Sequence, residues 1–190
     1  MGIDGAKAGL GRKGSFVLGA ALVCSLTTGQ ASAATQGTLG ATSTGSITIS
    51  ASVPNRARLT GLSDVSFANQ DPSTAALNAQ DVCVWSNTAT KAYTITASGS
   101  GTGSAFTLSN GASTAPYAVE WASTSGQTSG TALTAGTASS SLTSGAVNQN
   151  CSSAPLASAS LIIKMTTATL GTMSAGSSYT GTLTLLVTPL

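Results

Sequence analysis

The C-terminal stretch Ser177-Ser-Tyr-Thr-Gly-Thr-Leu-Thr-Leu-Leu-Val-Thr-Pro-Leu190 sets the expectation for the whole fold. The residues on one side of this chain, when it is extended, are mostly apolar: Tyr179, Gly181, Leu183, Leu185 and Val187. Threonines occupy the other side, with Leu186 as the exception. This two-residue period predicts a half-buried β-strand. Such an uncharged strand is either central and paired on both sides, or an open edge that recruits another strand.

Similar alternating segments recur along the chain, separated by turns rich in Gly, Ser and Asn. The expected strands are Ser46–Val53, Arg58–Phe67, Val82–Ser86, Ala92–Ser98, Ala105–Leu108, Tyr117–Ala122, a weak one at Ser140–Thr143, Ser158–Met165 and Tyr179–Thr188. Short strands at this spacing, without a helical period, predict an all-β antiparallel sandwich. A chain of 190 residues suits one such domain, at 46–190.

The first 33 residues have the pattern of a secretory signal peptide. Lys7, Arg12 and Lys13 form a positive n-region, Phe16–Leu26 is an apolar run, and small residues end the segment at Ala33. This order predicts cleavage before Ala34, because the apolar run is too short to span a membrane. An uncleaved anchor is the alternative. Val23 stands before Cys24 and argues against lipidation, which favours a small residue there.

The exported chain is expected to be nearly uncharged. Four cations (Arg56, Arg58, Lys91, Lys164) stand against four anions (Asp64, Asp71, Asp81, Glu120), and four minus four is zero. A neutral chain favours association over solubility. It has no basic face for nucleic acid, so no nucleic-acid partner is expected. With only 4% aromatic residues, the core is expected to be thin and to need a cross-link or a partner.

Nothing in the sequence predicts an enzyme or a cofactor site. The chain has no histidine, which excludes Ser-His and Cys-His pairs and imidazole metal ligands. The Gly-rich stretch Ser98-Gly-Ser-Gly-Thr-Gly103 lacks the lysine and the following helix of a phosphate-binding loop. Catalytic residues, metal ligands and cofactors are therefore all expected to be absent.

Two cysteines remain after the leader, Cys83 and Cys151. In an exported, oxidised chain they have one possible pairing, so a disulfide is expected, with the two Cα atoms within about 7 Å. Metal binding is the competing interpretation, but two thiols without a histidine make a poor site.

Four segments resemble the subunits of bacterial chaperone–usher pili, especially the archaic branch with spore coat protein U-like domains and its relatives in the alternate branch. They are Ile47-Thr-Ile-Ser-Ala-Ser-Val-Pro54, Leu62-Ser-Asp-Val-Ser-Phe67, Ala115-Pro-Tyr-Ala-Val-Glu-Trp121 and Ala175-Gly-Ser-Ser-Tyr-Thr-Gly-Thr-Leu-Thr-Leu-Leu-Val187. Relatives often carry a cysteine where this chain has Arg56 and Arg58, and another where it has Ser86.

The resemblance implies an immunoglobulin-like sandwich that lacks one strand. A periplasmic chaperone would fill the gap first, and the N-terminal extension of the next subunit would fill it in the fibre, delivered through an outer-membrane usher. Residues 34–45 are then the candidate donor, acting in trans or on their own domain, although a disordered tail has the same composition. The candidate donor residues share one parity: Leu39, Ala41, Ser43, Gly45 and Ile47. Leu39 would be the large anchor, and Gly45 is small enough to pass a constriction.

Together these features predict a structural fimbrial subunit, exported through the periplasm and polymerised on the cell surface with copies of itself or related pilins. The residues from Tyr179 to Val187 would form the strand that borders the groove and meets the chaperone. The alternative is a secreted monomeric module that binds carbohydrate or mediates adhesion. That module would need Trp85, Tyr117 and Trp121 on an exposed face.

Overall fold

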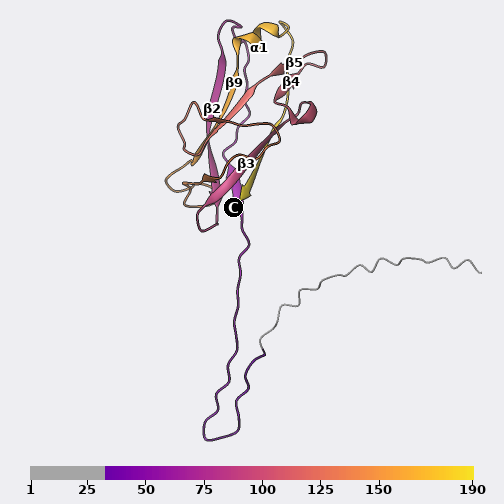
Figure 1. The fold of residues 1–190 in the computed structure, drawn as a ribbon. Coiled ribbons are helices and arrows are strands. Elements are labelled where there is room, and N and C mark those ends of the chain that lie inside the picture. The colour runs from indigo at the N-terminus through magenta and orange to yellow at the C-terminus, as the bar shows by residue number, and fades with distance from the viewer. Residues whose placement is uncertain (1–32) are drawn as a thin grey trace, which may run out of the picture. The chain divides into compact units, whose positions relative to one another are not determined.

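The computed structural model describes residues 33–190. They fall into two separate units, which divide between Ala51 and Ser52. Each unit is considered by itself. The predicted signal peptide, except for Ala33, lies outside the described residues. All helices and strands of the described chain belong to residues 52–190 (Figure 1).

Residues 33–51 form a loop that is held together by a single β-bridge. Thr35 and Ser46 exchange two backbone hydrogen bonds, of 2.9 and 3.0 Å. The side chains between and after them are exposed, with 73% exposure for Ile47 and 83% for Ile49. The predicted strand Ser46–Val53 is therefore wrong, since its residues have no ladder partner beyond that bridge. Alternation specifies which face a strand would bury, but a strand also needs a neighbouring edge for its backbone groups.

The body is built from two antiparallel sheets and a small hairpin. The larger sheet has the order β1 (Ala57–Thr60), β2 (Ala76–Ser86), β9 (Ala159–Met165), β6 (Ala118–Ala122) and β7 (Thr131–Ala132). The smaller has the order β10 (Leu183–Pro189), β3 (Ala92–Gly99) and β8 (Leu142–Thr143). The hairpin joins β4 (Thr107–Ser109) and β5 (Thr114–Pro116), and the helices are η1 (Thr102–Ser104) and α1 (Thr167–Thr172).

This strand order is that of an immunoglobulin-like sandwich. In that fold, strands A, B, E and D form one sheet and C, F and G form the other. Here β1, β2, β9 and β6 take the places of A, B, E and D, and β3 and β10 take those of C and F. No strand within residues 33–190 takes the place of G, next to β10. The predicted all-β antiparallel fold is confirmed.

The main core lies between the sheets and is small. Val82 and Val84 of β2, Tyr93 and Ile95 of β3, and Trp121 of β6 are all buried. The indole N–H of Trp121 donates to the Tyr93 hydroxyl over 3.1 Å, which satisfies both polar groups inside the core. Burial raises the pKa of Tyr93.

Several strand boundaries differ from those predicted. The first strand ends at Thr60, where Gly61 takes a positive φ of 85°, and does not continue to Phe67. The next strand begins at Ala76. Its start was predicted at Val82, because Asn78 and Gln80 interrupt the apolar pattern before that residue. The last strand begins at Leu183 instead of Tyr179. The helix α1 and strand β7 were not expected.

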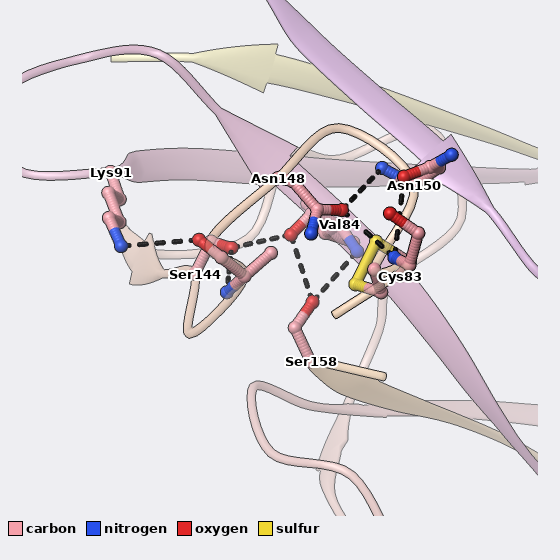
Figure 2. The surroundings of a disulfide bond; sticks show 10 residues. Cys83, Val84, Lys91, Ser144, Asn148, Asn150 and Ser158 are labelled. Carbon is pink, nitrogen blue, oxygen red and sulfur yellow. Dashed lines mark hydrogen bonds between the residues drawn. A yellow bond between two sulfur atoms is a disulfide. The ribbon is translucent and has the colours of Figure 1, made fainter. Parts of the chain in front are cut away.

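The predicted disulfide is confirmed. Cys83 and Cys151 are bonded with their Cα atoms 5.9 Å apart, and their separation of 68 residues is worth about 4 kcal/mol in the chain-entropy model. The bond fastens the loop 144–158 to β2 (Figure 2). Next to it, the Ser158 hydroxyl accepts from the Val84 N–H (2.8 Å) and donates to the Val84 carbonyl (2.9 Å). The Ser144 hydroxyl donates to the same carbonyl, so this loop is held to β2 by polar contacts as well.

Candidate functional site

A groove of about 980 Å³ runs beside the C-terminal strand. One wall is the segment 62–67, and the other is the segment 176–183 together with Leu185. Its apolar floor comes mainly from Leu161, Ile163 and Met165 of β9. At the end near α1, the groove is lined by Leu170 of α1 and by Met173, which follows that helix. The groove therefore exposes part of the interior of the sandwich at the place where an immunoglobulin fold has strand G.

The wall formed by β10 is an unpaired sheet edge. On its inner side, β3 holds it in a continuous antiparallel register from Leu183 with Gly99 to Pro189 with Tyr93. Along β10, half-buried residues alternate with exposed ones, and Leu186 is 59% exposed on the outer face. Leu183 and Leu185, which face inward, are only half buried because nothing among the described residues covers them in the groove.

The hydrogen-bond pattern shows which backbone groups of β10 are free. The N–H of Leu190 donates to the carbonyl of Ala92 over 3.0 Å. In an antiparallel ladder the residues that bond to one neighbour alternate with those that point away from it. The even-numbered residues of β10 therefore bond to β3. The N–H and C=O groups of Leu183, Leu185 and Val187 point to the open edge, where they can accept a further strand.

The opposite wall is also without a strand partner. Beyond Gly61, a side chain bridges the gap to β2: the Ser63 N–H donates to Gln80 Oε1 (2.8 Å), and Gln80 Nε2 donates to the Ser63 carbonyl (3.2 Å). Val65 and Phe67 turn inward and pack against the core. The segment 62–67 thus lines the groove without belonging to a strand ladder.

At the α1 end of the groove, polar contacts fix the chain before it enters β10. The Tyr179 hydroxyl lies 2.7 Å from the Ser113 hydroxyl and accepts from the Ser174 N–H over 3.1 Å. These hydrogen bonds, chiefly the one with Ser113, lower the pKa of Tyr179. Thr180 exchanges two backbone bonds with Ser109, of 2.8 and 2.9 Å. This wall is consequently anchored at its start as well as along β3.

At the other end of the body, the Asn87 side chain holds Pro54 and Arg56, which follow the N-terminal segment (residues 33–51) in the chain. Asn87 Oδ1 accepts from the Arg56 N–H over 2.6 Å, and Asn87 Nδ2 donates to the Pro54 carbonyl over 2.9 Å. The Asn87 N–H also donates to the Arg56 carbonyl over 3.1 Å. Since β1 begins and β10 ends at this end, residues 54–56 lie at the end of the body opposite α1.

Four of the five residues expected to border a groove contribute to the lining of this one. Tyr179, Gly181, Leu183 and Leu185 line the groove, whereas Val187 packs against the main core instead. The candidate donor residues all lie in the separate unit that ends at residue 51, and they are exposed: Leu39, Ala41, Ser43, Gly45 and Ile47. The role of the segment 62–67 does not follow from the sequence, because its alternation predicts a longer first strand.

The aromatic residues do not form an exposed binding face. Trp121 is only 2% exposed, and its indole is bonded inside the core. Tyr117 is half buried and packs against Phe106 with ring centroids 5.7 Å apart. Trp85 is half buried beside the disulfide. This arrangement counts against the alternative of a monomeric carbohydrate-binding module.

Within residues 33–190, no three acidic, cysteine or histidine side chains come close enough together to hold a metal ion. None of the helices in that range has the length and apolar character needed to cross a membrane.

No family model matches the chain, and no curated protein matches it. Among solved structures, it is similar to a chain in the work described as "Chaperone-tip adhesin complex is vital for synergistic activation of CFA/I fimbriae biogenesis". The TM-score is 0.45 and the sequence identity is 18%, and the match covers 72% of this chain and 41% of the other. This chain thus spans less than half the length of that neighbour.

Proposed function

We propose that the protein is a structural subunit of a cell-surface fibre, assembled by adding a β-strand from one copy to the groove of another. The observation that carries this is the groove itself, which combines an apolar floor with the unpaired edge of β10. An added strand would hydrogen-bond to the free backbone groups of β10 and insert alternate side chains into the groove. It would thereby complete the sandwich at the position of strand G.

The N-terminal segment supplies a suitable donor. Its exposed apolar residues share one parity, beginning with Leu39 and continuing through Ile47 and Ile49. Alternate residues of an extended strand point to the same side, so all three can enter one groove together. The intervening Ala41, Ser43 and Gly45 are small and would need little room in the groove.

Transfer between copies has a direction. The donor segment leaves the body at the end where β1 begins, and the groove extends toward α1 at the other end. A contact between two unlike surfaces repeats without closing and generates a filament. In such a filament the donor would enter the neighbour's groove from the α1 end and run antiparallel to β10.

The same incompleteness implies helper proteins before assembly. An exported subunit with an exposed apolar groove and an open edge is prone to aggregate. A periplasmic chaperone that lends a strand to β10, followed by an outer-membrane usher, would protect it, as the resemblance to chaperone–usher pilins implies. The Cys83–Cys151 disulfide suits export to an oxidising compartment.

The test compares two matched substitutions in the donor. Leu39→Asp would place a carboxylate in an apolar groove, where it has no partner, so we expect fibres to be lost while folding and chaperone capture are retained. Thr38→Asp changes a neighbour of opposite parity and should leave fibres nearly unaffected. Fibre yield is measured by electron microscopy and by SDS-resistant ladders, and chaperone capture by co-purification.

Equal fibre yields from the two variants would contradict the donor assignment. A wild-type chain that is fully folded, stable and monomeric without a chaperone would show instead that the segment fills its own groove, and polymerisation would lose its support.

A further inference from the structure

The charges of the body are sorted toward its two ends. Residues 52–190 carry four cations and four anions, and among the described residues the single ion pair is Lys164 with Glu120, at 2.7 Å on adjacent strands. Asp81 is held on the outer face of the large sheet by the Ser160 hydroxyl (2.7 Å) and the Gly126 N–H (2.6 Å). The remaining five charged side chains make no ion pair with one another.

Three of these five are cations at the end where the N-terminal segment leaves. Arg56 is fixed there by its backbone hydrogen bonds to Asn87. Arg58 is exposed and lies opposite Trp85 in the β1–β2 register, near the end of β2. Lys91 lies in the turn from β2 to β3, with its Nζ 3.2 Å from the Ala146 carbonyl. The side chains of Arg56, Arg58 and Lys91 therefore give this end of the body a positive charge.

The other two are anions on the groove side of the body. Exposed Asp64 belongs to the groove wall. Asp71 lies in the loop before Ala76, where β2 begins, and it accepts from the N–H and hydroxyl of Ser73, both at 2.8 Å. These bonds lower the pKa of Asp71 and keep it ionised. Because β2 has 11 residues, its two ends lie roughly 35 Å apart.

We propose that the end of one copy that carries Arg56 and Arg58 (the arginine end) docks against the side of the next copy that carries Asp64 and Asp71 (the aspartate side). This charge complementarity selects head-to-tail assembly. The partner is a second copy of this chain, and the inference rests on the proposed function. Donation of the segment before Pro54 brings Arg56 and Arg58 of the donor copy to the groove mouth of the acceptor, on the side that carries Asp64 and Asp71.

Complementary charge at this contact would act mainly on the rate and the orientation of encounter. Exposed pairs contribute little affinity, but they steer association and disfavour wrong pairings. Two copies meeting arginine end to arginine end would repel each other, which discourages closed pairs that cannot grow. The attraction should weaken with salt, since the Debye length falls from about 10 Å at 0.1 M to about 3 Å at 1 M.

The experiment follows growth of the chaperone-released chain by light scattering at low and high salt. The first variant carries Arg56→Glu and Arg58→Glu, and the second carries Asp64→Arg and Asp71→Arg. We expect each alone to grow about tenfold slower than wild type at low salt. The fourfold variant restores complementarity with the net charge of wild type, so it should grow at the wild-type rate. An equimolar mixture of the two double variants should also recover, because their ends alternate in sign.

Wild-type growth of either double variant at low salt, or failure of the fourfold variant to recover while its thermal midpoint matches wild type, overturns the proposal. These results differ from failure of the proposed function. If wild-type growth depends on Leu39 but not on the charges, only the present inference is lost. If wild type forms no fibre with its chaperone and usher, both are lost.

Discussion

At the scale of single residues, Gly181 shows how closely the segment before β10 approaches β4. A Cβ at this position would lie 2.9 Å from the Thr107 carbonyl oxygen and 3.0 Å from Leu108 Cδ2. Distances this short force the backbone of β4 or of the groove wall to move. The residue is thus needed for its small size, which lets the wall pass over β4 before it joins β3.

We expect Gly181→Ala to destabilise the protein by about 1–3 kcal/mol, the usual cost of overpacking. Gly145→Ala is the matched control, since a Cβ there would meet nothing within 4 Å. Urea unfolding of the two purified variants measures the difference. Equal midpoints would show that β4 yields freely and that the contact does not constrain the wall.

At the scale of elements, the pairing of β6 with β9 carries the ion pair on the outer face of the large sheet. Lys164 Nζ lies 2.7 Å from both Glu120 oxygens, and the Gly130 N–H donates to Oε2 over 2.9 Å. The hydrogen bond from Lys164, followed by that from Gly130, lowers the pKa of Glu120 below its ordinary 4.5. A lowered folded-state pKa stabilises the protein above the unfolded pKa, and this contribution is lost as the pH falls through the folded pKa.

Glu120→Gln should therefore cost at most about 1 kcal/mol at pH 7, because the pair is partly exposed and screened. The deficit relative to wild type should shrink below pH 4.5 and vanish once Glu120 is protonated. Thermal midpoints of both proteins between pH 3 and pH 7 test this. A deficit that is the same at every pH would assign the effect to packing and not to charge.

Elements also show where sequence patterns predict structure and where they do not. The patterns of Ala92–Ser98 and Ser158–Met165 closely match β3 and β9, because both strands lie between two neighbours. β3 buries one alternating face, and β9 is buried on both faces except at Lys164. Ser46–Val53 has an equally good pattern and forms no strand, since alternation says nothing about whether an edge is available. The polar Gln80 of β2 concealed the start of that strand, and its amide serves instead to hold the groove wall at Ser63.

At the scale of the whole molecule, no strand within residues 33–190 covers the groove beside β10. The missing strand could be anticipated from uncharged alternating ends, but the groove required three segments distant in sequence: 62–67, β9 and 176–185. Their approach depends on the pairing of β2 with β9 and of β3 with β10, which no local pattern specifies. For the same reason the sequence offered a candidate for the wall only at Tyr179–Val187 and offered none for the opposite wall at 62–67.

If the N-terminal segment is a donor strand, as proposed, adding it as a peptide should stabilise the folded body by mass action. We expect a synthetic peptide of residues 36–53 to raise the thermal midpoint of the Leu39→Asp chain, by the equivalent of about 2.7 kcal/mol at a hundredfold excess over its Kd. The control peptide carries Ile47→Asp and Ile49→Asp and should have little effect. Equal shifts with the two peptides would mean that the groove does not recognise apolar side chains of this parity.

The disulfide divides the chain into a closed covalent ring and two free arms. The ring, from Cys83 to Cys151, contains β3 to β8, whereas the arms contain β1, most of β2, β9, α1 and β10. Both walls of the groove lie on the arms, so the groove can widen without straining the cross-link. A protease that cuts anywhere within the ring leaves one covalent molecule, and both arms still hang from it until the disulfide is reduced.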